Sequence, residues 1–291
     1  MNISDTEILR SQNFIPRCDH WFAITALDGK MEMPSTAQQV LRRSNVLGDW
    51  VNQFDVDTLT PTSVVFCKFD YLEYLIKYLE FRGCKTPFIL LTGQSDYPIT
   101  DGVFDYFNSR FPISWWGCNN ECSRANGVPL GIADDFCDLT VKSGFEQTSG
   151  NRLLYVNHRV ETFPTVRKSL YSMFEGKEWT TVRPALKKGD TNLYKQELLD
   201  HKFILCPRGN GVDTHRMWEA LYCGVIPIVQ RHPVHANIEG KLPVLFVDSY
   251  YEVTEELLQN TYSNFKSRTW QTDMLTVSWW MNQFKGNANA Y

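Results

Sequence analysis

KFILCPRGNGVDTHRMWEALYCGVIPIV, residues 202–229, contains the pattern that decides the fold of this chain. The runs KFILCP and VIPIV are short and apolar, as buried strands usually are. Between them, THRMWEALYC has the spacing of a short helix, which ends at Gly224. A strand, a loop, a helix and a second strand in this order predict neighbouring parallel strands of an α/β fold.

The same alternation of apolar runs and helical patterns extends through most of the chain. A polar segment with two glycines at 140–151 interrupts it, which is typical of a domain linker. We therefore predict two Rossmann-like domains that face each other across a cleft, at 1–145 and 146–268, and a helix at 269–291 that packs back on the N-terminal domain. The expected strands lie at 63–69, 87–93, 113–119, 127–133, 152–158, 179–185, 202–207, 225–230 and 242–248, and the expected helices at 35–54, 70–83, 103–111, 165–176, 192–201, 214–223 and 253–268.

Charge and hydropathy exclude several classes of protein. The 291 residues carry a formal net charge of −4, which leaves no global basic field to attract a nucleic acid. No apolar run is long enough to span a membrane, and the N-terminus lacks a signal-peptide pattern. We expect a soluble, cytoplasmic protein with reduced thiols, with a local Cys118–Cys122 disulfide as the alternative.

The glycine-containing loop and its helix have the chemistry of an anion site. Gly209 and Gly211 permit backbone conformations that leave amide N–H groups pointing outward. Thr214 or Asp213 can cap the next helix, whose N-terminus favours a phosphate. Arg216 in the first turn can bind diphosphate oxygens, and Glu219 lies on the same helical face, where a carboxylate can accept ribose hydroxyls. The other interpretation is a simple turn followed by an exposed ion pair.

Residues 202–229 closely resemble the C-terminal signature of exostosin-like glycosyltransferases (glycosyltransferase family 47), through CPRG, DTHR-x-WEAL and G-x-IPIV. The resemblance extends more loosely to LLYVNHRVETFPTVRKSL and GVPLGI. It implies a GT-B fold and an inverting transfer from a nucleotide sugar to a glycan hydroxyl, without an obligatory metal or other cofactor. In such folds Arg216 would neutralise the diphosphate and Glu219 would hold the ribose. We expect a UDP-sugar, with UDP-xylose as the first choice. The alternatives are a GDP-fucose-using GT-B enzyme and an inactive nucleotide- or glycan-binding protein.

The loop YVNHRVETFP is expected to contact the same diphosphate from the opposite side. Asn157 and Arg159 follow the first strand of the C-terminal domain, and His158 between them can face the cleft. His215 can donate to the donor sugar or to the diphosphate. The full predicted donor site comprises Asn157, Arg159, Arg208, Gly209, Asn210, Gly211, Thr214, His215, Arg216 and Glu219.

The acceptor hydroxyl needs a general base, which we expect at the carboxyl end of a strand in the N-terminal domain. Asp96 is the first choice and Asp70 the second; Asp134 and Asp135 rank third. The Asp55-x-Asp57 pair has the spacing of a metal-binding motif, but it precedes a proline-containing loop and does not end a buried strand. We therefore predict no metal site.

Two tryptophan pairs are candidate sugar-stacking platforms. Trp115 and Trp116 lie in a predicted strand, where neighbouring side chains point to opposite faces. Trp279 and Trp280 lie in the predicted C-terminal helix. We expect one member of each pair to be buried in the core, which leaves the other free to stack on an acceptor.

Overall fold

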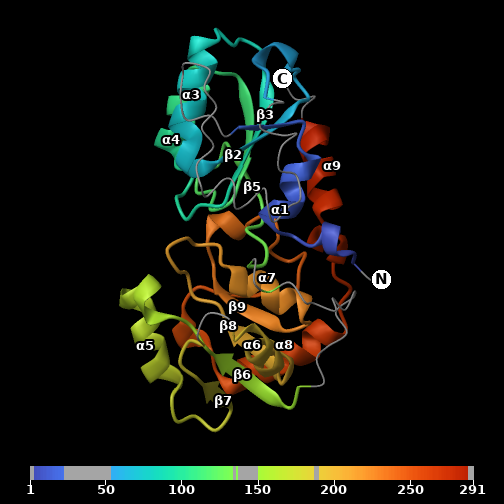
Figure 1. The fold of residues 1–291 in the computed structure, drawn as a ribbon. Coiled ribbons are helices and arrows are strands. Elements are labelled where there is room, and N and C mark those ends of the chain that lie inside the picture. Colours follow the sequence, from blue (N-terminus) through green and yellow to red (C-terminus); the bar gives the residue numbers. More distant parts are fainter. Residues whose placement is uncertain (1–2, 23–53, 134–135, 137–149, 187–189, 288–291) are drawn as a thin grey trace. The chain divides into compact units, whose positions relative to one another are not determined.

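The computed structural model describes residues 3–22, 54–133, 136, 150–186 and 190–287. The chain divides into two compact units, each with its own parallel sheet. The first unit is Met1–Ile8 with Gly131–Thr276, and it is called the donor unit below because it contains the predicted donor-site residues; the second unit is Leu9–Leu130 with Val277–Tyr291. Helices alternate with the strands in both units (Figure 1). The prediction of an α/β protein with two Rossmann-like domains is therefore confirmed.

The donor unit has a reversal in its strand order. In the described residues its five parallel strands run in the order β10-β9-β8-β6-β7. The first strand, β6, therefore lies between β7 and β8, and the chain builds the sheet outward in both directions from it. Ligands of open α/β sheets bind beyond the carboxyl ends of the strands at such a point. The strands are β6 Arg152–Val156, β7 Thr180–Val182, β8 His201–Leu205, β9 Ile226–Gln230 and β10 Leu245–Val247.

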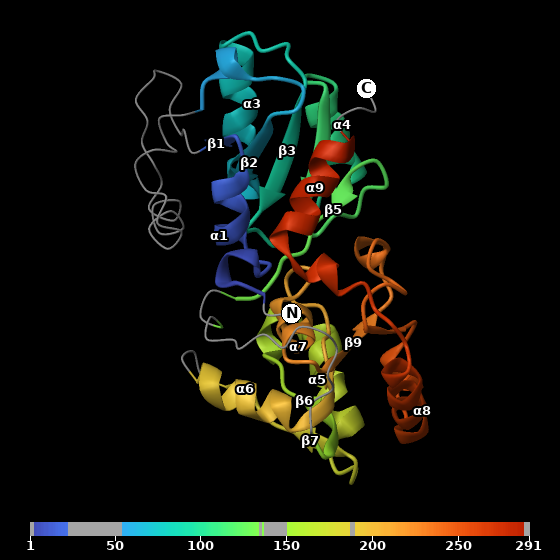
Figure 2. The ribbon, with the colours of Figure 1, turned by 90° about the vertical axis from the view of Figure 1, so that its right-hand side faces the viewer.

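Helices cover both faces of this sheet. Leu170 and Phe174 of α5 and Leu258 of α8 share one core with alternate residues of β6, β8 and β9. Tyr194 of α6 packs on the other face, where its ring meets that of Tyr155. Figure 2 shows α6 and α8 on opposite sides of the strands. The helices are α5 Pro164–Phe174, α6 Thr191–Leu199, α7 His215–Tyr222 and α8 Glu255–Lys266.

The second unit has a sheet without a reversal. Its described strands lie in chain order, β1-β2-β3-β4-β5, and all neighbours are parallel. Helices α3 and α4 cover one side of the sheet, and α1 and α9 cover the other (Figure 1). The strands are β1 His20–Phe22, β2 Val64–Lys68, β3 Phe88–Gly93, β4 Ile113–Gly117 and β5 Asn126–Gly127, and the helices are α1 Ser11–Phe14, α3 Leu72–Phe81, α4 Asp101–Asn108 and α9 Val277–Asn287.

Two predicted elements differ clearly from the observed ones, and two observed elements were not predicted. The strand expected at 127–133 is reduced to a short pairing of β5 with β4. The C-terminal helix begins only at Val277, after a 3-10 turn at Thr272–Leu275. β1 and α1 were not predicted, because a strand of three residues and a helix of four are too short for a periodic pattern. Most of the helix expected at 35–54 and of the linker at 140–151 lies outside the described residues.

The expectation that only one of Trp115 and Trp116 is buried was wrong. Their side chains are 1% and 5% exposed, because β4 is covered by helices on both faces. Trp280 is also buried, whereas Trp279 is half-buried. Neither Trp115 nor Trp116 can therefore offer an indole face to an acceptor sugar.

The described cysteines are buried free thiols, including Cys118 and Cys122. The Cys122 thiol donates to a carboxylate oxygen of Asp101, and the Cys118 thiol donates to the carbonyl oxygen of Pro129. Across the described part of the chain, every helix is too short or too polar to cross a membrane.

Candidate functional site

Two loops of the donor unit meet where the strand order reverses. One follows β6 and contains Asn157, His158 and Arg159, and the other follows β8 and contains Arg208 and the two glycines. Because β6 and β8 are adjacent parallel strands, their carboxyl ends lie at the same edge of the sheet. The sequence-predicted donor residues are therefore brought together by the topology of this sheet.

Arg167 of α5 joins the two loops, although it was not among the predicted site residues. Its guanidinium donates to the carbonyl oxygens of Arg208 at 2.7 Å, Pro207 at 2.8 Å and Arg159 at 2.9 Å. A fourth hydrogen bond reaches the Thr162 hydroxyl at 2.6 Å. Arg167 is buried, and burial lowers its pKa to about 10, with the nearby Arg216 charge acting in the same direction.

Arg216 lies in the first turn of α7 and points to the end of β6. Its Nη1 donates to the Asn157 side-chain oxygen at 3.4 Å and to the Tyr194 hydroxyl at 3.3 Å. The guanidinium also lies 5.4 Å from the centre of the Tyr194 ring. Asn157 is itself fixed, since its Nδ2 donates to the Pro184 carbonyl at 2.7 Å. Arg216 and Asn157, which follow adjacent strands of one sheet, are therefore in direct contact.

Glu219 lies one turn after Arg216 and is buried. Its Oε1 accepts a hydrogen bond from the Ala133 backbone N–H at 3.3 Å. Burial raises the pKa of this carboxyl, and the neighbouring positive groups of His215 and Arg216 oppose that rise. A carboxylate has about four lone-pair positions, so Glu219 keeps acceptor capacity for ligand hydroxyls.

The N-terminus of α7 has no side-chain cap. Thr214 is the N-cap residue, but its hydroxyl makes no capping hydrogen bond. Asp213, the other predicted cap, instead accepts a hydrogen bond from the Trp218 indole at 2.8 Å. His215 is exposed, and its Nδ1 lies 2.7 Å from the Gly131 carbonyl, so this nitrogen carries the hydrogen and donates it. The predicted N-cap position at Thr214 is therefore correct, but its hydroxyl does not offset the partial positive charge of the helix end.

The two glycines of the loop act differently from the prediction. Neither Gly209 nor Gly211 is among the described residues with a positive φ. The Gly209 N–H donates to the Gly211 carbonyl at 3.0 Å, so this amide does not point outward. Glycine is instead needed at 209 for space, because a Cβ there would lie 3.1 Å from Nη2 of Arg167.

Arg208 and Arg159 complete a group of four arginines at this edge of the sheet. The Arg208 guanidinium lies 4.6 Å from the centre of the Phe163 ring, and its Nε is buried without a partner. Arg159 is exposed. Neither arginine, nor Arg167 or Arg216, forms an ion pair with a described carboxylate. Asn210, which was also predicted, is exposed in the same loop.

The His158 imidazole uses one of its ring nitrogens for a contact within the protein. Its Nε2 lies 2.8 Å from the Arg167 carbonyl, and its ring packs 4.4 Å from that of Tyr171. Burial lowers the pKa of His158 to about 4, so the imidazole is neutral at pH 7. Because Nε2 donates, Nδ1 carries the lone pair, and this buried atom has no hydrogen-bond partner in the described structure.

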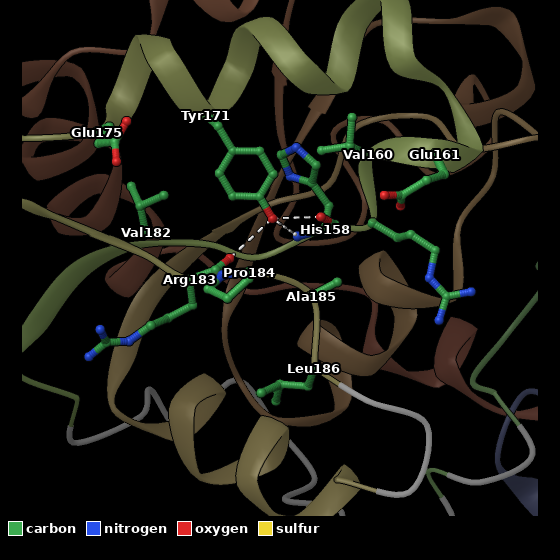
Figure 3. Close-up of a pocket in the computed structure, with 11 residues that line it drawn as sticks. His158, Val160, Glu161, Tyr171, Glu175, Val182, Arg183, Pro184, Ala185 and Leu186 are labelled. Atoms are coloured by element: carbon green, nitrogen blue, oxygen red, sulfur yellow. Dashed lines mark hydrogen bonds between the residues drawn. The ribbon is translucent and has the colours of Figure 1, made fainter.

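A cavity of about 660 Å³ lies beside this site (Figure 3). Its walls come from the loop after β6, from α5, and from the end of β7 with the loop that follows it. The lining residues are His158, Arg159, Val160, Glu161, Tyr171, Glu175, Val182, Arg183, Pro184, Ala185 and Leu186.

The predicted catalytic base belongs to the second unit. Asp96 is exposed in the loop after β3, and the alternative, Asp70, forms an ion pair with Lys68 at 3.4 Å. Asp134 and Asp135 lie outside the described residues. Within the described part of the chain, no three His, Cys, Asp or Glu side chains are grouped as a metal site.

The Asp55-x-Asp57 pair has a structural partner. Both carboxylates contact Nη2 of Arg82, at 3.4 Å from Asp55 and 2.7 Å from Asp57. Asp55 also accepts a hydrogen bond from the Asp57 backbone N–H, which fixes the first turn of a 3-10 helix. These contacts give the two carboxylates a structural role at the start of the 3-10 helix.

Sequence reasoning missed three side chains that organise the site. Arg167, Tyr171 and Tyr194 all come from helices, and each of them contacts a loop or a helix that is distant in sequence. Arg167 lies within the loosely matching stretch of 153–170, but its own partners are mainly backbone carbonyls. Backbone carbonyls leave no mark in a sequence, so only the fold identifies these roles.

No protein-family model and no curated protein matches this sequence. Among solved structures, the chain is similar to the crystal structure of an α,α-trehalose-phosphate synthase (UDP-forming) from Burkholderia vietnamiensis. The TM-score is 0.43 and the sequence identity is 11%, over 97% of this chain and 82% of that chain. A likeness at this level identifies no function. The resemblance to exostosin-like glycosyltransferases therefore stays a prediction.

Proposed function

We propose that the protein is a glycosyltransferase of the GT-B type that binds a nucleotide sugar at the edge of the donor sheet. The observation that carries this proposal is the group of Arg159, Arg167, Arg208 and Arg216, none of which is ion-paired with a described carboxylate. Positive charges concentrated at the carboxyl ends of parallel strands favour a polyanion, and a diphosphate fits both the charge and the helix N-terminus of α7.

The neighbouring groups favour a nucleoside diphosphate over a free anion. Glu219 would be repelled by a phosphate, but its carboxylate can accept hydrogen bonds from vicinal hydroxyls such as those of a ribose. It lies one helical turn beyond Arg216, so the two side chains are neighbours on one helical face and can contact adjoining parts of one ligand. We propose a UDP-sugar as the donor, with UDP-xylose tested first and GDP-fucose as the competing donor.

The proposed reaction is an inverting, metal-independent transfer to a glycan hydroxyl. The acceptor oxygen forms a bond to the anomeric carbon while the bond from that carbon to the diphosphate oxygen breaks. The electron pair leaves with the nucleoside diphosphate, and the acceptor proton passes to Asp96. Arg216, Arg208 and the N-terminus of α7 stabilise the negative charge on the leaving group; one such donor is typically worth about 3 kcal/mol.

Calorimetry with UDP and GDP, with and without EDTA, tests donor binding. Arg216→Ala and Glu219→Ala should each weaken UDP binding about tenfold or more, because each removes a charged hydrogen-bonding partner worth roughly 1.5–3 kcal/mol. Asp96→Asn should keep the UDP affinity and abolish transfer from a radiolabelled UDP-sugar.

Three results would contradict this proposal. If neither nucleotide binds, the donor site is wrong; if EDTA abolishes transfer, the mechanism requires a metal. Normal transfer by Asp96→Asn would remove Asp96 as the base and make Asp70→Asn the next variant to measure.

A further inference from the structure

The cavity between the β6 and β7 loops is directly connected to the proposed phosphate site. Asn157 accepts a hydrogen bond from Arg216 through Oδ1 at 3.4 Å and donates one through Nδ2 to the Pro184 carbonyl at 2.7 Å. Pro184 lines the cavity. Only the Asn157 carboxamide therefore lies between Arg216 of the proposed phosphate site and Pro184 of the cavity wall. One ligand can reach both Arg216 and the cavity.

The polar groups in the cavity wall are already used by the protein. The Tyr171 hydroxyl donates to the carbonyl oxygen of His158 at 2.5 Å and accepts from the His158 backbone N–H at 3.0 Å. It also lies 3.1 Å from the Arg183 carbonyl. The Pro184 carbonyl is occupied by Asn157. The Tyr171 ring is thus held in place, and it offers a ligand an aromatic face without a free hydroxyl.

The remaining wall is mainly apolar and the rim is charged. Val160, Val182, Pro184, Ala185 and Leu186 contribute aliphatic surface. The charged side chains belong to two arginines, Arg159 and Arg183, and to two glutamates, and all four residues are exposed. The exposed glutamates are Glu161 and Glu175.

His158 supplies a polar atom that lacks a partner. The residue is 1% exposed, it lines the cavity, and its Nδ1 has no hydrogen-bond partner in the described structure. The neutral ring leaves a lone pair on Nδ1. An unsatisfied buried acceptor costs roughly 1–3 kcal/mol, and because the surface of this atom is closed to water we assign no ligand contact to it.

A flat ring with apolar faces matches this lining better than a sugar or an alkyl chain. A sugar would need several polar partners inside the cavity, where those of Tyr171 and Pro184 are occupied, and an alkyl chain would not use the aromatic face of Tyr171. The volume of about 660 Å³ lies within the range of small-molecule sites.

We propose that this cavity, lined by His158, Tyr171 and the loop 182–186, binds the nucleobase of the nucleotide whose diphosphate lies at Arg216. The proposal rests on the function proposed above and adds the part of the protein that selects the nucleoside. Uracil and guanine are both flat rings of this kind, and the binding of UDP and GDP distinguishes between them.

Filling the cavity tests the proposal. Ala185→Trp places an indole in the lining from a loop that is not part of the sheet, and Ala236→Trp is the matched control, because Ala236 is exposed in the same unit and does not line the cavity. We would measure the affinity of both variants and of the wild type for UDP, GDP and inorganic pyrophosphate by calorimetry, and check folding by circular dichroism.

Wild-type protein is expected to bind UDP or GDP at least tenfold more tightly than pyrophosphate. Ala185→Trp should remove most of that advantage and leave pyrophosphate binding unchanged, while Ala236→Trp should change neither. If Ala185→Trp folds and binds the nucleotide like the wild type, the cavity does not hold the base. If the wild type binds pyrophosphate as well as it binds both nucleotides, this inference fails but the anion site stands. If it binds none of the three, the proposed function fails together with the inference.

A second measurement does not depend on a variant. Photo-crosslinking with 5-azido-UDP and with 8-azido-GDP, followed by peptide mass spectrometry, should label peptides that contain Tyr171 or the loop 182–186. Unlabelled nucleotide should compete with the labelling. Competable labelling confined to other peptides would overturn the proposal even if the tryptophan variant fails to fold.

Discussion

Arg167 acts on the proposed anion site through the backbone of the two loops that form it. Its four hydrogen bonds go to three carbonyl oxygens and one hydroxyl, so its charge is solvated by dipoles and is not neutralised by a carboxylate. It therefore has two effects at once. It fixes the loops after β6 and β8 against each other, and it adds positive potential next to Arg216. We regard Arg167 as a positioning residue.

Substitution of Arg167 can separate these two effects. Arg167→Lys keeps the charge but cannot reach all four acceptors, so we expect about a tenfold loss of UDP affinity. Arg167→Met also removes the charge, and the loss should exceed that of the lysine variant. Calorimetry at low temperature measures both affinities, and urea unfolding confirms that the variants are folded.

Arg231→Lys is the control for the Arg167 substitutions. Arg231 is an exposed arginine of the same unit, paired with Asp248 and Glu239, and its replacement should leave UDP binding unchanged. If Arg167→Lys binds UDP as tightly as the wild type, UDP binding does not depend on the hydrogen bonds that fix the two loops. If Arg167→Met and Arg167→Lys bind UDP equally tightly, UDP binding does not depend on the charge of Arg167.

At the residue scale, sequence reasoning found the side chains that follow a glycine-containing loop and missed those that act on it from a distance. Arg216 and Asn157 were both predicted for one site, because both follow strands of one parallel sheet, and their direct hydrogen bond was not predicted. Tyr194 and Arg167 could not be predicted, since their contacts depend on which helix covers which face of that sheet. Thr214 is the N-cap residue, as one of the two predictions had it, but its hydroxyl makes no capping bond, and Trp218 engages Asp213, a contact that local sequence rules do not include.

At the element scale, the loop 206–214 depends on the close approach of α5. Gly209 is buried, and a Cβ at this position would lie 3.1 Å from Nη2 and 3.6 Å from Cζ of Arg167. The guanidinium has little room to move, because it is already hydrogen-bonded to both loops. The loop therefore needs glycine so that a helix side chain can pass directly against its backbone.

We expect Gly209→Ala to displace the Arg167 guanidinium and to loosen both loops. The free energy of unfolding should fall by about 1–3 kcal/mol, as for other overpacked sites, and UDP affinity should fall several-fold. Gly102→Ala is the control, because a Cβ there meets nothing within 4 Å. It should change the free energy of unfolding by less than about 1 kcal/mol and leave UDP binding unchanged. Equal behaviour of the two variants in urea unfolding and calorimetry would contradict the steric role of Gly209.

The observed strands and helices show which elements can be predicted from the periodicity of apolar residues. Most helices of eight or more residues with an apolar face were found with small errors at their ends, as for α3 and α8, whereas the start of α9 was predicted too early. Thr254 caps α8, because its hydroxyl accepts from the Leu257 N–H. β1 and β5 are too short to show alternation, and their positions are set by pairing with β2 and β4. Such elements are decided by the sheet and not by their own residues.

At the scale of the whole molecule, the last helix of the chain belongs to the second unit, whose other residues are Leu9–Leu130. α9 packs on the second unit through Phe284, whose ring lies 4.8 Å from that of Trp116 and 6.2 Å from that of Phe14. Every described residue of the proposed donor site belongs to the other unit. The helix α9 therefore stabilises one unit, and the proposed nucleotide site lies in the other unit.

Phe284→Ala tests this assignment. The side chain is 0% exposed, so its removal should lower the free energy of unfolding by about 3–5 kcal/mol, which urea titration with tryptophan fluorescence measures. UDP affinity, determined by calorimetry where the variant is folded, should equal that of the wild type because no donor-site residue has been touched. Phe81→Ala, at a position 67% exposed in the same unit, should change stability by less than about 0.5 kcal/mol. A folded Phe284→Ala protein that no longer binds UDP would show that nucleotide binding depends on the packing of the second unit, and the donor site would then have to be extended beyond the residues assigned here.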